Sequence, residues 1–173
     1  MKIMIIGYSG SGKSTLAEFL SREYRVPALY LDALHFLPNW VEREESEENA
    51  LLADFLDKND GWVIDGNYSK NNYSRRLEEA DLIILMLFDR FSCLYRAFKR
   101  SREFRNRVRP SIAEGCTEKM DLEFAMWILH GGRKKRQRER YAGIAEKYAD
   151  KCVTIRNQRE LDRYYATFSN NLT

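Results

Sequence analysis

The feature that most constrains this chain is the octapeptide at residues 7–14, Gly-Tyr-Ser-Gly-Ser-Gly-Lys-Ser. Its glycines let the backbone fold tightly around an anion, so that successive N–H groups converge on phosphate oxygens. Lys13 then reaches the β- and γ-phosphates of a nucleotide, and the Ser14 hydroxyl is placed to coordinate Mg²⁺. The residues that we expect to hold a nucleoside triphosphate are Gly7, Ser9, Gly10, Ser11, Gly12, Lys13, Ser14 and Thr15.

The sequence on both sides of the octapeptide supports this interpretation. Residues 3–6 form a short apolar run that suits a buried parallel strand. Leu16, Phe19 and Leu20 recur at helical spacing after the lysine. The N-terminus of that helix adds its dipole to the loop. Strand, glycine loop and helix follow in the order that phosphate binding requires, which a chance Gly/Ser-rich turn would not need.

Apolar runs and helical patterns alternate along the rest of the chain. Strands are predicted at 2–6, 28–32, 62–65, 82–88 and 152–156. Helices are predicted at 13–24, 44–58, 69–79, 91–107, 119–130, 133–149 and 158–169, the last with a capping box from Asn157 to Glu160. Strands that alternate with helices favour an α/β fold, in which helices cover both faces of a parallel sheet.

The length of 173 residues and 44% hydrophobic content suit one domain over 1–173, since no repeat or linker is visible. The longest apolar run, 82–88, is too short to span a membrane, and the first residues lack the pattern of a signal peptide. We therefore expect a cytoplasmic protein, a monomer or homodimer, with no membrane partner. Cys93, Cys116 and Cys152 are widely spaced, which indicates reduced thiols.

Charge is distributed unevenly although the net value is only +3. Glutamates gather at 42–48, and bases gather at 96–109 and 133–140. The stretch 91–149 contains both basic blocks and no predicted strand, so it is expected to form a helical lid over a ligand. Two alternatives remain open for these bases, a solvated helix face and contact with nucleic acid, where Phe98 and Phe104 would lie among the charges. The small net charge argues against a duplex-binding protein.

A phosphate loop of this kind needs an acidic partner for the metal, usually at the end of a neighbouring strand. Asp32, Asp65 and Asp89 each end a predicted strand. Ligands of open parallel sheets bind at the carboxyl ends of strands, which favours a functional role for Asp65 and Asp32. Asp89 directly precedes a predicted helix, and its simpler interpretation is a helix N-cap.

Other side chains are candidates for contact with the substrates. Arg96 and Arg100 are four residues apart and share one helix face, from which they could stabilise a transferring phosphoryl group. His35 and Trp40 follow Asp32 and could form the wall of an acceptor site, although packing is an equal alternative for Trp40. His130 follows an apolar run and is interpreted as a packed or capping side chain.

Taken together, these segments resemble the bacterial DNA topology modulation proteins, a branch of the adenylate kinase-like P-loop kinases. The resemblance covers nearly the whole chain. The segments that carry it are 7–14, Leu31-Asp32-Ala33-Leu34-His35, Trp62 to Ser69, Asp89-Arg90 with Arg96 and Arg100, and Cys116 to Phe124 leading to Trp127.

The resemblance implies a three-layer P-loop NTPase fold with a five-stranded parallel sheet. It places an acceptor-binding helical region at about 33–60 and the lid at about 91–149. It further implies ATP and Mg²⁺ as cofactors and phosphoryl transfer to a small acceptor, a nucleotide or a hydroxyl metabolite. Lys13 would be catalytic, Ser14 and Asp65 would position the metal, and Asp32 would orient the acceptor. Arg96 and Arg100 resemble the lid arginines of the family, and Arg133 and Arg136 resemble those of its return helix.

One departure from the family concerns the acceptor. Nucleoside monophosphate kinases follow the Asp-Gly of their third strand with Pro-Arg, and this chain has Asn67-Tyr68. Arg43 stands among glutamates in the acceptor region, whereas a phosphorylated acceptor requires an arginine clamp. Arg75 and Arg76 are the alternative sources of such a clamp. A DNA-binding regulator and a slowly hydrolysing nucleotide switch are the competing functional hypotheses.

Overall fold

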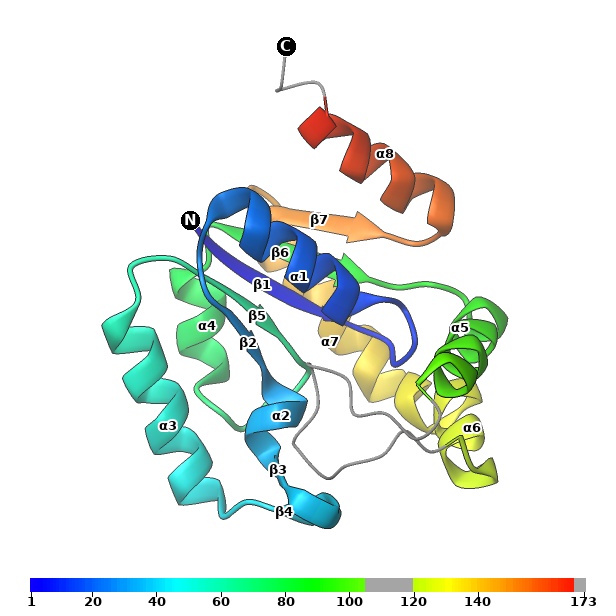
Figure 1. Ribbon diagram of the computed structural model, residues 1–173. Coiled ribbons are helices and arrows are strands. Elements are labelled where there is room, and N and C mark those ends of the chain that lie inside the picture. Colours follow the sequence, from blue (N-terminus) through cyan, green and yellow to red (C-terminus); the bar gives the residue numbers. More distant parts are fainter. Residues whose placement is uncertain (105–119, 170–173) are drawn as a thin grey trace.

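The structure, a computed structural model, describes residues 1–104 and 120–169, and Figure 1 shows the arrangement of their helices and strands. A five-stranded sheet lies at the centre of the fold, with the spatial order β2-β5-β1-β6-β7 and parallel pairing throughout. Its strands are β1 (Lys2–Gly7), β2 (Ala28–Tyr30), β5 (Trp62–Asp65), β6 (Leu82–Met86) and β7 (Cys152–Ile155). The predicted α/β fold with a five-stranded parallel sheet is therefore confirmed.

Helices cover both faces of this sheet, and the central strands are therefore buried on both sides. They are α1 (Lys13–Tyr24), α3 (Glu45–Lys58), α4 (Tyr73–Glu79), α5 (Arg90–Glu103), α6 (Leu122–Leu129), α7 (Lys135–Lys147) and α8 (Gln158–Ser169). Along β1, Ile3 and Ile5 face one core, and Met4 and Ile6 face the other. This alternation produces three layers from an almost continuous apolar sequence.

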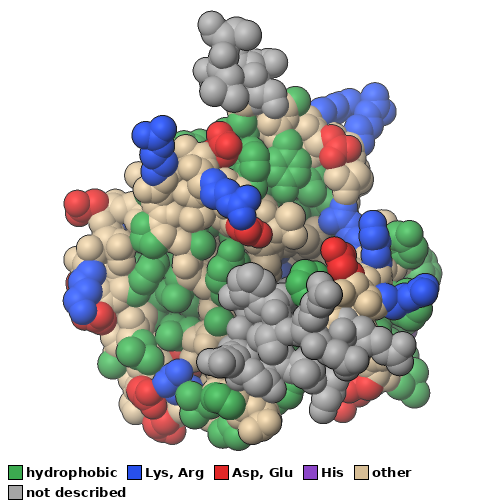
Figure 2. Space-filling view, viewed as in Figure 1, with side chains coloured by type: hydrophobic (Ala, Val, Ile, Leu, Met, Phe, Trp, Pro, Cys, Tyr) green, Lys and Arg blue, Asp and Glu red, His purple; other side chains and the backbone are tan. Residues whose placement is uncertain are grey.

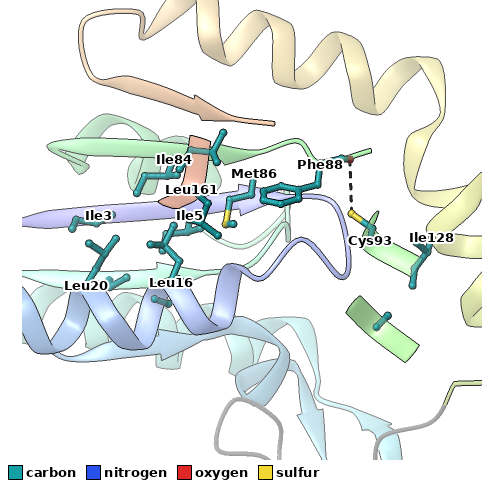
Figure 3. Close-up of a cluster of buried hydrophobic side chains, with 14 residues drawn as sticks. Ile3, Ile5, Leu16, Leu20, Ile84, Met86, Phe88, Cys93, Ile128 and Leu161 are labelled. Atoms are coloured by element: carbon teal, nitrogen blue, oxygen red, sulfur yellow. Dashed lines mark hydrogen bonds between the residues drawn. The ribbon is translucent and has the colours of Figure 1, made fainter. Parts of the chain in front are cut away.

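The two cores are formed by different helices. Helices α1, α5, α6 and α8 pack on one face of the sheet, and Figure 3 shows this core around Leu16, Met86 and Phe88. Helices α3, α4 and α7 pack on the other face, through Leu52, Leu77 and Tyr141 among others. Within residues 1–104 and 120–169, no helix is long and apolar enough to cross a membrane.

The structure differs from the sequence prediction just after β2. The predicted strand 28–32 ends at Tyr30, and the short helix α2 (Leu31–His35) begins there. A two-stranded antiparallel hairpin that the pattern did not predict follows, formed by β3 (Phe36–Leu37) and β4 (Val41–Glu42) around the 3-10 turn η1 (Pro38–Trp40). Its turn holds Asn39 and Trp40 at φ values of 64° and 63°, a left-handed conformation that is rare outside glycine.

Side-chain caps fix the starts of α5 and α8. The Asp89 carboxylate accepts hydrogen bonds from the N–H groups of Phe91 and Ser92, both at 2.9 Å, so its N-cap interpretation is confirmed. The predicted capping box of α8 is also present, since Asn157 Oδ1 accepts a 3.0 Å bond from the N–H of Glu160. Part of the predicted lid, residues 105–119 with Cys116, lies outside the described residues.

Candidate active site

The glycine loop between β1 and α1 folds at the carboxyl end of the central strand. Gly7 has φ +149°, and a Cβ atom there would lie 2.2 Å from the carbonyl oxygen of Met86 on the neighbouring strand. Gly10 has φ +79°, and its Cβ would lie 2.4 Å from the carbonyl of Cys93 on α5. Both positions require glycine because the loop is in close contact with the backbone of other elements. The loop is therefore held from two sides before any ligand binds.

A serine hydroxyl and a carboxylate meet at the base of this loop. Ser14, in the first turn of α1, donates a 2.6 Å hydrogen bond to Oδ2 of Asp65 at the end of β5. Asp65 is 7% exposed, and the pairing of β5 with β1 positions it beside the loop. A hydroxyl and a carboxylate are hard oxygen donors of the kind that Mg²⁺ prefers, so this pair fits a magnesium ion. Lys13, next to Ser14 in the first turn of α1, donates a 3.2 Å bond from Nζ to the Tyr8 carbonyl.

A large cleft, with a volume of about 2590 Å³, opens over the loop and extends along the carboxyl ends of the strands. The predicted site residues that line it are Gly7, Ser9, Gly10, Gly12, Lys13, Ser14, Thr15, Asp32, Asp65, Arg96, Arg100 and Arg136. Ser11 was also predicted to bind phosphate, but its side chain is fully buried and its N–H donates to the Tyr8 carbonyl at 3.2 Å.

Arg96 joins helix α5 to the phosphate loop. One of its guanidinium nitrogens donates a 2.9 Å bond to the Ser11 carbonyl, and the other donates to the Gln158 side chain. Its guanidinium carbon lies 4.3 Å from the centre of the Phe88 ring, within cation–π range. Arg100 lines the same cleft one turn further along α5. Of the two predicted lid arginines, Arg96 therefore contacts the loop, and Arg100 lines the same cleft.

The two arginines of the predicted return helix have different positions. Arg136, on α7, lines the cleft. Arg133 does not, because the short turn Gly131–Arg133 directs its guanidinium to the carbonyls of Phe88 (3.0 Å) and Ile128 (2.9 Å). Its guanidinium carbon lies 3.8 Å from the centre of the Tyr8 ring. Arg133 therefore supports the glycine loop from behind, which corrects its predicted place over the phosphates.

A second group of polar side chains faces the loop across the cleft. Asp32, in the first turn of α2, accepts a 2.9 Å hydrogen bond from the Tyr68 hydroxyl. Burial and the neighbouring Asp32 carboxylate raise the pKa of Tyr68, so its hydroxyl stays a donor. The Tyr68 ring lies 4.7 Å from the His35 ring, centre to centre. Tyr68 therefore joins two residues that the sequence suggested separately.

His35 is fixed by a carboxylate that the sequence did not single out. Its Nδ1 lies 2.9 Å from Oε2 of Glu48, which is only 2% exposed and also accepts a bond from the Asn71 amide. Trp40 packs edge-on against Phe36 at 5.1 Å, and both line the cleft. The amphipathic pattern of α3 could have shown Glu48, because it occupies the same face as Leu52 and Leu56.

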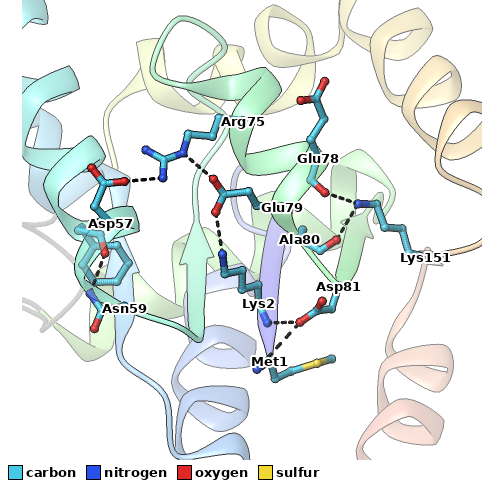
Figure 4. Close-up of polar contacts among 11 residues, drawn as sticks. Met1, Lys2, Asp57, Asn59, Arg75, Glu78, Glu79, Ala80, Asp81 and Lys151 are labelled. Carbon is cyan, nitrogen blue, oxygen red and sulfur yellow. Dashed lines mark hydrogen bonds and ion pairs between the residues drawn. The ribbon is translucent and has the colours of Figure 1, made fainter.

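The two arginines proposed as an alternative clamp do not reach the cleft, and this prediction is wrong. Arg75 forms ion pairs with Asp57 and Glu79 at the far side of α4, as Figure 4 shows. Arg76 is fully buried and donates to the carbonyls of Asn71 and Tyr68. Arg75 is thus engaged by carboxylates of α3 and α4, and Arg76 by the loop after β5.

Asn67 stands where nucleoside monophosphate kinases have proline, and the structure gives it a role that the sequence did not reveal. Its side-chain Oδ1 accepts a 2.9 Å bond from the N–H of Gly7, and its Nδ2 donates a 2.5 Å bond to the Gly7 carbonyl. The Tyr141 hydroxyl on α7 also donates to Oδ1, at 3.2 Å. Arg140, another residue that the sequence did not single out, donates to the Asn67 carbonyl at 3.4 Å. Asn67 thus links the loop to α7.

Comparison with known proteins gives likeness at the level of the fold. No family model matches this chain, and no curated protein matches its sequence. Among solved structures, deoxyadenosine kinase from M. mycoides, determined with the products dCMP and a flexible dCDP bound, covers 100% of both chains with a TM-score of 0.53 and 13% identity. TT1252 from Thermus thermophilus has a TM-score of 0.55 and 17% identity, over 100% of this chain and 98% of its own. The chain therefore has a fold similar to that of P-loop kinases.

Proposed function

We propose that this protein is a phosphotransferase that transfers the γ-phosphoryl group of Mg-ATP to a small acceptor. The observation that carries the proposal is the 2.6 Å bond between Ser14 and Asp65 directly beneath a glycine loop and a helix N-terminus. A hydroxyl and a carboxylate at this place fit the metal of a bound nucleotide, and the loop amides with Lys13 fit its phosphates. The resemblance to the topology modulation proteins supports the same proposal.

The residues that would bind Mg-ATP would act by positioning its phosphates and stabilising their negative charge. Mg²⁺, held by Ser14 and Asp65, would neutralise charge on the β- and γ-phosphates. Lys13 would bind the same oxygens, and Arg96, Arg100 and Arg136 would face the transferring group from the lid side of the cleft. Asp32 would orient the acceptor from the opposite wall.

Replacement of the loop lysine tests this proposal. Lys13→Ala removes the cation that faces the β/γ-phosphates but no buried apolar group, so the fold should be retained. We expect ATP turnover to fall by about 10²-fold or more. Circular dichroism and a thermal unfolding curve would verify the fold of the variant. Phosphoryl transfer at the normal rate by the folded variant would overturn the proposal.

One observation favours a second function, contact with nucleic acid. The outer face of α5 exposes Phe91 and Tyr95, at 71% and 68%, and Phe98. Figure 2 shows hydrophobic and basic side chains together on that side of the molecule. Aromatic and basic side chains together can hold a phosphate backbone and stack on bases. We favour the kinase proposal because Arg96 and Arg133 bind inward, to Ser11 and Phe88. Absence of duplex DNA binding at low salt would exclude this second function.

A further inference from the structure

Carboxylates dominate the side of the cleft formed by residues 31–48 and 67–73, which we call the acceptor wall. The acidic residues among its lining are Asp32, Glu42, Glu44, Glu45 and Glu48. The basic residues of this wall are Arg43 and Lys70, and both bind within the protein. Arg43 donates to the Leu34 carbonyl at 2.8 Å and pairs with Glu47, while Lys70 pairs with Glu45 at 3.2 Å. Within the described residues 31–48 and 67–73, each of these two cations therefore has a carboxylate partner in the wall itself. Arg140 of α7 borders the wall, donates to the Asn67 carbonyl at 3.4 Å and lies 5.3 Å from the centre of the Tyr73 ring.

In the buried part of the wall, the Glu48 carboxylate fixes the orientation of the His35 imidazole. Glu48 accepts from Asn71 and lies 2.9 Å from His35 Nδ1, so this nitrogen carries the proton and donates it to Glu48. Nε2 lies 3.9 Å from Oε1 of Glu42, so carboxylates face the ring on both sides. An unphosphorylated ligand that presents N–H or O–H donors would be bound here, whereas a phosphate would meet two carboxylates.

Asp32 presents a second carboxylate that can accept hydrogen bonds, nearer to the strand ends. The Tyr68 hydroxyl occupies one of its oxygens at 2.9 Å, which orients the carboxylate. Asp32 lies two residues beyond Tyr30, and Tyr30 pairs with Asp65 across β2 and β5. The carboxylate is thus on the same edge of the sheet as the proposed metal pair. A hydroxyl bound to Asp32 would be near the phosphoryl group to be transferred.

From these contacts we propose that the acceptor is an alcohol without a phosphate group, either neutral or carrying an amine, and not a nucleoside monophosphate. The inference rests on the proposed function. In the step, the acceptor oxygen forms a bond to the γ-phosphorus, and the bond from that phosphorus to the β,γ-bridging oxygen breaks. ADP leaves with the electron pair, and the hydroxyl proton goes to the Asp32 carboxylate. Asp32 and His35 contact the acceptor, and Glu48 is a positioning residue that acts through His35.

The test uses matched pairs of compounds with the full-length protein and Mg-ATP. Nucleosides, aldoses and amino alcohols are compared with their own monophosphates by ADP release, and ³¹P NMR identifies any new phosphate ester. We expect at least one unphosphorylated compound to raise ADP release by about tenfold or more, with no rise from its monophosphate. Stimulation by the monophosphates, or by neither set, would overturn the inference. Mg-ATP binding without acceptor is measured separately, and its absence would instead overturn the proposed function.

Variants of the acceptor wall then test which side chains recognise the acceptor. Asp32→Asn should lower kcat with the acceptor by about 10²-fold or more, because the proton acceptor is lost. Glu48→Gln should raise the acceptor KM more than it lowers kcat, since the imidazole loses its orienting carboxylate. Asp54→Asn, on the exposed side of the same helix α3, is the matched control and should change neither. Lys70→Ala should also leave the acceptor KM unchanged, and a large increase would indicate anion recognition and contradict the inference.

Discussion

The side chain of Asn67 forms two hydrogen bonds with the backbone of Gly7, the first residue of the phosphate loop. Oδ1 accepts from the Gly7 N–H at 2.9 Å, and Nδ2 donates to the Gly7 carbonyl at 2.5 Å. Tyr141 adds a third bond to the same side chain from α7. Burial raises the pKa of Tyr141 to about 12, so its hydroxyl remains a donor at neutral pH. The Asn67 amide therefore fixes the position of the loop, and the Tyr141 hydroxyl in turn holds that amide in place.

Removal of the Asn67 amide should destabilise both the fold and the nucleotide site. Asn67→Leu leaves the N–H and the carbonyl of Gly7 without their partner, at a cost of about 1–3 kcal/mol. Nucleotide affinity should fall as well, because the loop loses one of its supports. Tyr141→Phe removes only one hydroxyl and should cost about 1 kcal/mol. Urea unfolding and ATP titration measure the two effects. Equal stability of Asn67→Leu and the wild type would contradict this role.

The Asp65 carboxylate should determine the magnesium requirement. Asp65→Asn retains an oxygen that can accept the Ser14 bond but loses the charge, so the concentration of Mg²⁺ for half-maximal ATP turnover should rise. Turnover itself should fall by about 10²-fold. Ser14→Thr keeps the hydroxyl and is expected to remain active, whereas Ser14→Ala should lose activity. An unchanged magnesium dependence in Asp65→Asn would exclude the proposed metal site. The measurement is a magnesium titration of initial rates.

Arg75 and Arg76 are neighbours in sequence, and their replacement should have very different costs. Burial lowers the pKa of the Arg76 guanidinium to about 10, and its bonds to the Asn71 and Tyr68 carbonyls hold the loop after β5. Arg76→Ala opens a cavity and leaves buried carbonyls unpaired, so we expect a loss of about 3 kcal/mol or more.

Arg75→Ala is the matched control, since its ion pairs with Asp57 and Glu79 are partly exposed (Figure 4). Such pairs contribute about 0–1 kcal/mol each. Chemical denaturation of the two variants gives the comparison. Equal losses would show that Arg76 is not the residue that holds this loop.

Asp89 should make the stability of α5 dependent on acid pH. Its bonds from Ser92 and Phe91 hold the pKa of the carboxyl below its usual value of 3.8. The folded state thus binds this proton less readily than the unfolded state does. The cap contributes fully above pH 3.8, and its contribution is lost as the pH falls through the lower pKa that Asp89 has in the folded state. Asp89→Ala should cost about 1 kcal/mol at neutral pH.

The difference between the wild type and Asp89→Ala should shrink toward zero as acid protonates the carboxylate. Asn is also a good N-cap, so Asp89→Asn should retain most of the cap without this pH dependence. Unfolding curves for the three proteins, recorded from neutral pH down to about pH 3, measure the effect. A difference that stays constant over this range would show that the Asp89 charge does not stabilise the helix.

Local pattern was sufficient for the architecture. Short apolar runs such as 3–6 and 82–86 can be buried only between two helical layers, and the predicted fold and all five strands follow from that requirement. The pattern failed at residues 31–42, where a short helix and a hairpin replace the end of the predicted strand. Segments of two to five residues carry too little periodicity to distinguish a turn from a strand.

The sequence by itself determined the phosphate loop, because Gly7 to Ser14 encode a backbone conformation that is local to eight residues. It also indicated Asp65, because a carboxylate that directly follows an apolar run can be recognised from the sequence alone. Only the tertiary structure decided what the other polar residues do. It directed Arg133 and Arg76 into the protein, joined His35 to Glu48, and placed Asn67 on Gly7 across 60 residues. Such contacts depend on how helices pack on the sheet, and no local pattern records that packing.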